Sequence, residues 1–198
     1  MGLFYTNYAL YGIDQKQVTT LINKLKRTGY VSPTVDQFNI YYDKESEDQD
    51  PNIIKKLAES FSNHFHCSVL ASVVHDSDIF LYWLYNSGKL IDTYNSIPDY
   101  FESTDEKSAP EGGDAEKLCS AFGNLKAVEN LKQIFNDVEQ SSLDEDWSGE
   151  YLQGEDIHLK IAEVLGMPSF AANIGFYTIE NGEIPEELNR DDLIKCAG

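Results

Sequence analysis

The hydrophobic pattern divides the chain into a strand-rich first half and a helix-rich second half. Residues 3–11 are rich in tyrosine and phenylalanine and alternate in part with polar residues, which is typical of a strand, and residues 35–42 indicate a second one. Between them, apolar residues recur at helical spacing. Asp14 and Gln17 give this predicted helix a capping-box start, and Gly29 ends it.

A second helix and three further strands complete the first half. The helix begins at Pro51, directly after Asp50, and its core-facing stripe runs to Phe65. Three apolar runs follow, joined by the turn sequences DSD and SG: residues 68–75, 79–86 and 89–96. The middle run is apolar at both parities, so we expect both of its faces to be covered. Because the connections are too short for parallel crossovers, these runs predict an antiparallel meander.

Polar segments separate and follow these elements. Residues 43–50 (DKESEDQD) hold five acidic residues and one lysine, which favours an exposed, mobile loop. The composition of residues 102–113 (ESTDEKSAPEGG) predicts a linker or a long loop. Beyond it, the pattern predicts helices at 114–122, 125–138 and 155–165 and a strand at 174–179.

Together these elements predict an α+β fold. We expect an antiparallel sheet, with the meander at its centre and helices packed on it, and a C-terminal half that is mainly helical. The length of 198 residues suits a single domain. In this interpretation residues 1–101 form a sheet-rich half, residues 102–113 a loop, and residues 114–198 a helical acidic half with a returning strand.

The charge is concentrated in the second half. The net charge is −19, from 34 acidic and 15 basic residues; residues 1–99 carry −4 of it and residues 100–198 carry −15. Such a field repels nucleic acid and anionic membranes and attracts basic protein surfaces. The alternative is that the acids serve solubility alone. The charge therefore argues against nucleic-acid and membrane partners and for a basic protein partner.

Cysteine usage and the absence of long apolar runs indicate a cytoplasmic location. Cys67, Cys119 and Cys196 are few, odd in number and irregularly spaced, which argues for a reducing compartment. No apolar run reaches transmembrane length. The sequence also lacks a nucleophile elbow, a Walker loop and a dinucleotide fingerprint, so no organic cofactor is predicted.

One segment matches most of a calcium-binding loop. An EF-hand loop needs oxygen ligands at positions 1, 3 and 5, a glycine at 6 and a bidentate glutamate at 12. In DEDWSGEYLQGE, the ligand positions are occupied by Asp144, Asp146, Ser148 and Glu155. Leucine at position 9 and the absence of a second hand favour the alternative, an acidic loop between helices. Calcium binding through this loop therefore stays an open alternative.

Polar side chains gather at the end of the predicted meander. The run LYNSGKLIDTYNSIPDYF contains Asp92, Tyr94, Ser96 and Tyr100. On a regular strand two sets of residues face opposite ways: Leu90, Asp92, Tyr94 and Ser96 on one side, and Ile91, Thr93 and Asn95 on the other. Asp92 and Tyr94 could act as acid and base only with a third partner, so we assign no catalytic residue. The group is either the polar bend that ends the strand or the rim of a binding surface.

His158 is a further candidate for that binding surface. It lies at the border of the apolar face of the predicted helix 155–165. A histidine there is either a packed side chain or a base. We include it with the binding candidates near Asp92.

Several motifs resemble an uncharacterised group of small soluble bacterial proteins. They are LYxxGxLxDxYNSxPxYF, GGDAxxLCxxFG, HxxIAxxLGMP and a later GF. The matching residues are Gly88, Asp92, Tyr94, Ser96, Pro98, Phe101, Gly113, Asp114, Leu118, Phe122, Gly123, His158, Leu165, Gly166 and Pro168. The similarity covers a little over half of the chain. It implies a bacterial, cytoplasmic origin and carries over no catalytic residue.

These observations predict a non-enzymatic protein that docks on a basic partner surface, with charge steering and aromatic anchors. In size and acidity the chain is similar to the immunity proteins that accompany bacterial toxins. A first alternative is an enzyme or a small-ligand-binding protein with a pocket near Asp92, Tyr94 and His158. A second alternative is a calcium-responsive module that acts through residues 144–155.

Overall fold

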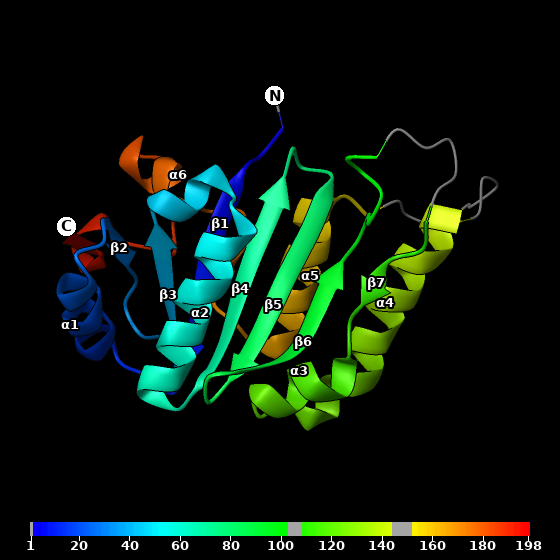
Figure 1. Ribbon diagram of the computed structural model, residues 1–198, viewed down its shortest axis with the longest axis horizontal. Coiled ribbons are helices and arrows are strands. Elements are labelled where there is room, and N and C mark those ends of the chain that lie inside the picture. Colours follow the sequence, from blue (N-terminus) through cyan, green and yellow to red (C-terminus); the bar gives the residue numbers. More distant parts are fainter. Residues whose placement is uncertain (1, 103–107, 144–151) are drawn as a thin grey trace.

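The computed structural model describes residues 2–102, 108–143 and 152–198, and within them one antiparallel sheet forms the centre of the molecule (Figure 1). Eight strands follow the order β7-β6-β5-β4-β1-β3-β2-β8. Their bounds are β1 Tyr5–Tyr11, β2 Gly29–Val31, β3 Phe38–Asp43, β4 Ser68–His75, β5 Ile79–Asn86, β6 Lys89–Asn95, β7 Glu111–Gly112 and β8 Ile194–Cys196. The predicted α+β fold is confirmed.

Helices in the described residues are divided between the two halves of the chain. The α-helices are α1 Gln15–Leu25, α2 Pro51–Phe65, α3 Ala115–Ala121, α4 Val128–Leu143, α5 Gly154–Leu165 and α6 Phe176–Glu180. The 3-10 helices are η1 Glu45–Asp48, η2 Leu125–Ala127, η3 Ser169–Ala171 and η4 Arg190–Asp192. As predicted, the C-terminal half is mainly helical.

The first six major elements form a compact β-α-β-β-α-β unit. Strands β4, β1, β3 and β2 are neighbours in that order, which is the split βαβ arrangement of ferredoxin-like folds. Both helices of the unit, α1 and α2, cover the same face of the sheet (Figure 1). Asp14 caps α1 through the predicted capping box, and Pro51 begins α2 directly after the cap Asp50.

The C-terminal helices cover the other face of the sheet. Leu131 of α4, Ile161 of α5 and Ile179 of α6 are fully buried in a core that includes Phe80 of β5. α5 is visible behind the sheet in Figure 1. Strand β5 is therefore covered on both faces, which confirms the interpretation of its apolar sequence.

A β-bulge in β6 changes which residues share a face. The register places Asp92 opposite Leu84. One step further Leu90 lies opposite Tyr85, so Ile91 is an extra residue on that strand. Leu90 therefore faces away from Asp92, and the prediction that these two residues share a face is wrong. One extra residue in a strand turns every side chain beyond it to the opposite face of the sheet.

The prediction of an exposed, mobile loop at residues 43–50 is wrong in part, because three of these eight residues are exposed and two are fully buried. Asp43 and Ser46 are fully buried, and Glu45–Asp48 form the 3-10 helix η1. The Glu47 carboxylate accepts a hydrogen bond from the backbone N–H of Phe176 at 2.8 Å. Burial raises the pKa of Glu47 to about 7. The segment is therefore held in place by tertiary contacts, which its acidic composition does not indicate.

The prediction of a strand at residues 174–179 is also wrong. Phe176–Glu180 form helix α6. The returning strand is β8 instead, which pairs with β2 and places Cys196 opposite Gly29. Strand β7 pairs Gly112 with Tyr94, inside the segment that the sequence predicted as a loop.

The cysteines are buried free thiols. They are Cys67, Cys119 and Cys196. Burial raises the pKa of Cys67 to about 11, so this thiol is a poor nucleophile at neutral pH. Over the part of the chain that the structure describes, no helix has both the length and the apolar character needed to cross a membrane.

Candidate functional site

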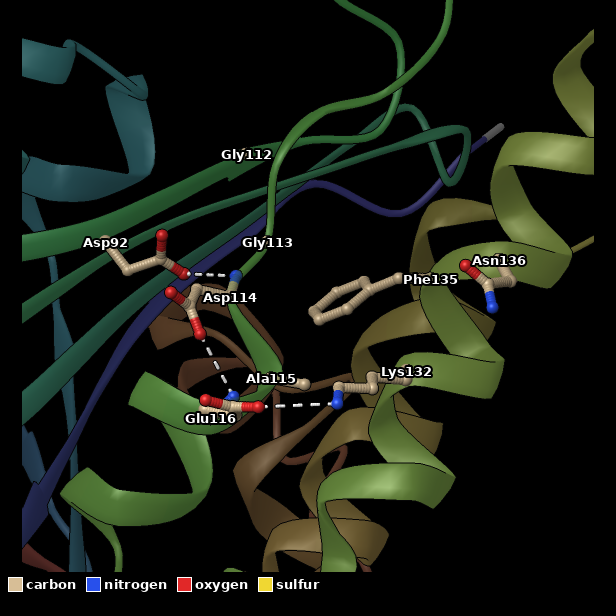
Figure 2. Close-up of a pocket in the computed structure, with 9 residues that line it drawn as sticks. All are labelled: Asp92, Gly112, Gly113, Asp114, Ala115, Glu116, Lys132, Phe135 and Asn136. Carbon is tan, nitrogen blue, oxygen red and sulfur yellow. Dashed lines mark hydrogen bonds and ion pairs between the residues drawn. The ribbon is translucent and has the colours of Figure 1, made fainter.

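An open cleft of about 520 Å³ lies between the outer strands β6 and β7 and helices α3 and α4 (Figure 2). Its lining residues are Asp92, Gly112, Gly113, Asp114, Ala115, Glu116, Lys132, Phe135 and Asn136. They come from four separate elements. We name this feature the α3–α4 cleft. It contains Asp92, one of the residues that the sequence indicated.

Two glycines bring one wall of the cleft close to β6. Gly112 and Gly113 have φ angles of +79° and +87°, in the left-handed region that favours glycine. A Cβ on Gly112 would lie 2.0 Å from the carbonyl oxygen of Thr93. That same oxygen accepts a hydrogen bond from Gly113 at 2.9 Å. The sequence EGGD therefore encodes a close approach that residues with side chains could not make.

Asp92 is a fixed carboxylate in the wall of the cleft. Its Oδ2 accepts hydrogen bonds from the Tyr82 hydroxyl at 2.5 Å and from the backbone N–H of Asp114 at 2.9 Å. Figure 2 shows the second of these bonds across the glycine turn. Burial first, and then the charge of Asp92, raise the pKa of Tyr82. Tyr82 therefore stays a proton donor that holds the carboxylate in place.

Asp114 begins α3 and adds a second carboxylate. Its Oδ1 accepts hydrogen bonds from the backbone N–H groups of Glu116 and Lys117, both at 3.0 Å, so the predicted helix cap is confirmed. The backbone hydrogen bond from Lys117 is the main cause that lowers the pKa of Asp114. This carboxylate is therefore ionised at neutral pH.

Helix α4 supplies the opposite wall. Lys132, Phe135 and Asn136 lie at i, i+3 and i+4, so they share one face of the helix. The Lys132 ammonium is 3.4 Å from Glu116 and 3.2 Å from Glu129, in exposed pairs that contribute little to stability. The Phe135 ring extends toward the glycine turn (Figure 2). From the sequence, only this helical spacing could have indicated that the three residues lie together, and they were not among the predicted site residues.

Tyr94 lies behind the cleft and does not line it. Only 3% of its surface is exposed, and its ring packs 5.0 Å from that of Phe135 and 5.6 Å from that of Tyr82. Its hydroxyl has no hydrogen-bond partner among the described residues. Burial first, and then the charge of Glu139, raise the pKa of Tyr94. Tyr94 is therefore a neutral wall residue at physiological pH.

Ser96 and His158 are buried in the sheet and its helical cover. The Ser96 hydroxyl accepts a hydrogen bond from the backbone N–H of Phe80 at 2.9 Å, which fixes the end of β6. The His158 ring stacks on Phe80 at 4.8 Å, and its Nδ1 lies 2.7 Å from the Tyr5 hydroxyl. Asp92 lines the α3–α4 cleft, whereas Ser96 and His158 do not. Tyr100 lies on a separate exposed surface, described below.

Acid destabilisation is the expected consequence of burying His158. Burial lowers the pKa of His158 to about 3, from an ordinary value of 6.5. Below pH 6.5 the unfolded chain binds a proton that the folded chain does not bind. The contribution of neutral His158 is therefore complete above pH 6.5 and is lost progressively as the pH falls toward 3. At about pH 5 the contribution of His158 should have fallen by about 2 kcal/mol. The raised pKa of Glu47 acts in the opposite direction over the same pH range, so the His158 contribution is measured by urea denaturation as a difference between variants.

Two glutamine variants isolate this contribution. Relative to the wild type, His158→Gln should gain about 2 kcal/mol in the free energy of unfolding when the pH is lowered from about 7.5 to about 5. The matched variant His64→Gln removes an exposed histidine at the end of α2 and should keep the pH dependence of the wild type. If His158→Gln kept the pH dependence of the wild type, the buried ring would be protonated in the folded protein at about pH 5.

Most of the residues predicted to bind calcium lie outside the part of the chain that the structure describes. Asp144, Asp146 and Ser148 lie outside the described residues. Glu155 lies in the first turn of α5, and its Oε2 accepts a hydrogen bond from the Ser77 hydroxyl at 2.9 Å. Among the residues that are described, no group of three or more histidine, cysteine or acidic side chains is arranged to hold a metal ion. Calcium binding stays a prediction.

Comparison with known proteins assigns no relative to this chain. No protein-family model, no curated protein and no solved structure matches it. The fold alone does not imply a function, because ferredoxin-like domains serve many unrelated ones. The chemistry of the α3–α4 cleft must therefore carry the functional argument.

Proposed function

We propose that this protein binds a basic partner protein without catalysing a reaction, and that the α3–α4 cleft receives a basic side chain of the partner. The observation that carries the proposal is the set of carboxylates of Asp92, Asp114 and Glu116, which face one lysine among the residues that line the cleft. Two hydrogen bonds fix Asp92 before any partner arrives. A pre-organised acceptor loses little conformational entropy on binding.

The aromatic wall suits the same occupant. Phe135 lies beside the carboxylates, so a cation in the cleft can interact both with a negative charge and with the face of a ring. The lining residues include no serine, threonine, cysteine or histidine, the side chains that most often form a nucleophile–base pair.

The long-range field supports the same partner. Residues 100–198, which include α3 and α4, carry a net charge of −15. Such a field accelerates the approach of a basic surface and repels nucleic acid. A toxin with a basic active face is the specific partner that this proposal favours, in a reducing, cytoplasmic setting that suits three free thiols. A toxin gene beside the gene for this protein would support that form of the proposal.

Affinity capture from a cell extract at low salt would isolate candidate partners, and the binding of each can then be measured separately. The immobilised protein would retain partners from an extract of its native cells at about 0.05 M salt, and each retained protein would be purified for surface plasmon resonance. We expect a partner of positive net charge, with an association rate that falls at least about tenfold by about 0.5 M salt.

Two charge reversals distinguish the cleft from the rest of the surface. Glu116→Lys at the cleft should lower the association rate about threefold to tenfold, because it reverses the local field. Glu59→Lys makes the same change of charge on α2, across the sheet, and should leave the rate within about twofold. Equal rates for both variants, or an extract from which no basic protein is retained, would contradict the proposal.

A further inference from the structure

A group of aromatic rings, two exposed and two half-buried, lies outside the α3–α4 cleft, where β4 turns into β5 and where β6 ends. We name it the aromatic surface; its members are Phe4, His75, Tyr100 and Phe101. The His75 ring is 4.7 Å from Phe4, 5.2 Å from Phe101 and 5.9 Å from Tyr100, each in an edge-to-face arrangement. Phe101 is 74% exposed and Phe4 is 47% exposed. Two large apolar side chains thus face solvent side by side with a histidine.

Hydrogen bonds hold this surface in place. His75 Nδ1 lies 2.7 Å from Oε1 of Gln49, which can only accept, so Nδ1 carries the proton. The backbone N–H of Leu3 donates to the Ser77 hydroxyl at 2.8 Å, and the N–H of Ser77 donates to the carbonyl of Leu3 at 2.9 Å. These bonds fix the segment that carries Phe4 against the β4–β5 turn. The rings are therefore positioned before any partner binds.

Acidic residues surround the rings. The three segments that form the surface, residues 2–4, 75–78 and 99–102, contain no lysine or arginine and the following acids: Asp76, Asp78, Asp99 and Glu102. Burial, and then the charges of Asp78 and Asp76, raise the pKa of the Tyr100 hydroxyl. The rim of the aromatic surface is thus negative at neutral pH.

We infer that the aromatic surface is the anchor for an arginine side chain of the basic partner. The guanidinium group is planar and weakly hydrated, so it can stack on the exposed rings of Phe4 and Phe101. The carboxylates of Asp76 and Asp78 at the rim pair with its charge. Lysine offers a compact, strongly hydrated charge that stacks less well.

Other occupants fit this surface less well. A second copy of the chain would bring a net charge of −19 toward an acidic rim. Nucleic acid and anionic lipid headgroups would meet the same repulsion. The inference rests on the proposed function, and it names the chemistry by which the same partner is held once charge has brought it close.

Short synthetic peptides test the arginine preference directly. One alternates glycine with arginine and another alternates glycine with lysine, and each is titrated into the isotope-labelled full-length protein while NMR spectra are recorded. We expect the arginine peptide to shift the ring resonances of Phe4, Tyr100 and Phe101 and to bind about threefold or more tightly than the lysine peptide. In the double variant Phe4→Ala/Phe101→Ala, arginine-peptide affinity should fall about fivefold and the preference should disappear.

A matched variant and the purified partner complete the test. Leu125→Ala removes another exposed apolar side chain, 66% exposed, and should keep the arginine preference. With the purified partner, the double variant should speed dissociation, whereas Glu116→Lys should slow association. Equal binding of the two peptides to the wild-type protein, or a preference that survives the double variant, would overturn the inference alone. Failure of both peptides and of any basic protein to bind the wild type would overturn the proposed function as well.

Discussion

Replacement of Arg27 by methionine is expected to lower the free energy of unfolding by about 3–5 kcal/mol. Arg27 is paired with Asp43, whose side chain has no exposure to solvent. Arg27 Nε donates to Oδ1 of Asp43 at 2.8 Å, and its Nη2 donates to Oδ2. Methionine keeps much of the aliphatic stem but leaves the carboxylate buried without a cation. Removing one partner of a buried ion pair is costly because the remaining charge cannot be solvated.

Urea denaturation of the variant and two controls measures this effect. Glu45→Gln removes the exposed partner of Arg27, 3.0 Å from Nη1, and should cost about 1 kcal/mol or less. Arg27→Met/Asp43→Asn removes both charges and should recover part of the loss. The single oxygen of the asparagine can still accept from Ser46 in place of Oδ2, whereas Tyr41, which donates to Oδ1, keeps only the carbonyl of Thr28 at 3.4 Å, so the recovery is incomplete. A loss below about 1 kcal/mol in Arg27→Met would mean that water reaches Asp43.

The same ion pair explains why sequence alone misjudged residues 43–50. Five acidic residues in eight indicate an exposed segment only if each acid is solvated. Here Asp43 is neutralised by Arg27, sixteen positions earlier in the chain. Glu47 is engaged by the backbone of Phe176, 129 positions later. Partners at such distances have no signature in the local pattern.

Helix α6 illustrates the same limit from the other side. Its sequence FYTIE combines aromatic and β-branched residues, which favour a strand. The Glu47 carboxylate accepts the first N–H of the segment, which satisfies a group that a helix start leaves unpaired. Phe176 and Ile179 then lie on the buried side of the helix. Tertiary contacts override a local preference that is worth less than one buried side chain.

The meander, by contrast, could be predicted because its information is local. Each strand pairs with its neighbour in sequence, and the short turns allow only antiparallel pairing. The candidate site was predictable only in part for the same reason. Asp92 belongs to the meander and was identified, whereas Phe135 and Lys132 reach the cleft from α4, some forty positions away. The bulge at Ile91 could not be predicted, because no residue pattern around it indicates an extra residue in the strand.

Replacement of Gly112 by alanine is expected to lower the free energy of unfolding by about 2–5 kcal/mol, from the sum of two effects. A φ angle of +79° is strained for alanine. The new Cβ would also lie 2.0 Å from the Thr93 carbonyl oxygen, which is a backbone atom and cannot rotate away. Relief requires the glycine turn to move off β6, which breaks the 2.9 Å bond from Gly113 to Thr93. The 2.9 Å bond from Asp114 to Asp92 should then lengthen as well.

Gly166→Ala separates the two effects, because Gly166 has nearly the same φ, +76°, with no atom within 4 Å of the position of a Cβ. Urea denaturation should give a loss of about 1–2 kcal/mol for Gly166→Ala and a clearly larger one for Gly112→Ala. Hydrogen exchange at the amides of Gly113 and Asp114 should accelerate only in Gly112→Ala. Equal losses in both variants, with protected amides, would mean that the glycine turn absorbs a side chain without moving. The hydrogen bond from Asp114 to Asp92 would then persist without Gly112, and the glycine pair would not be required to shape the cleft.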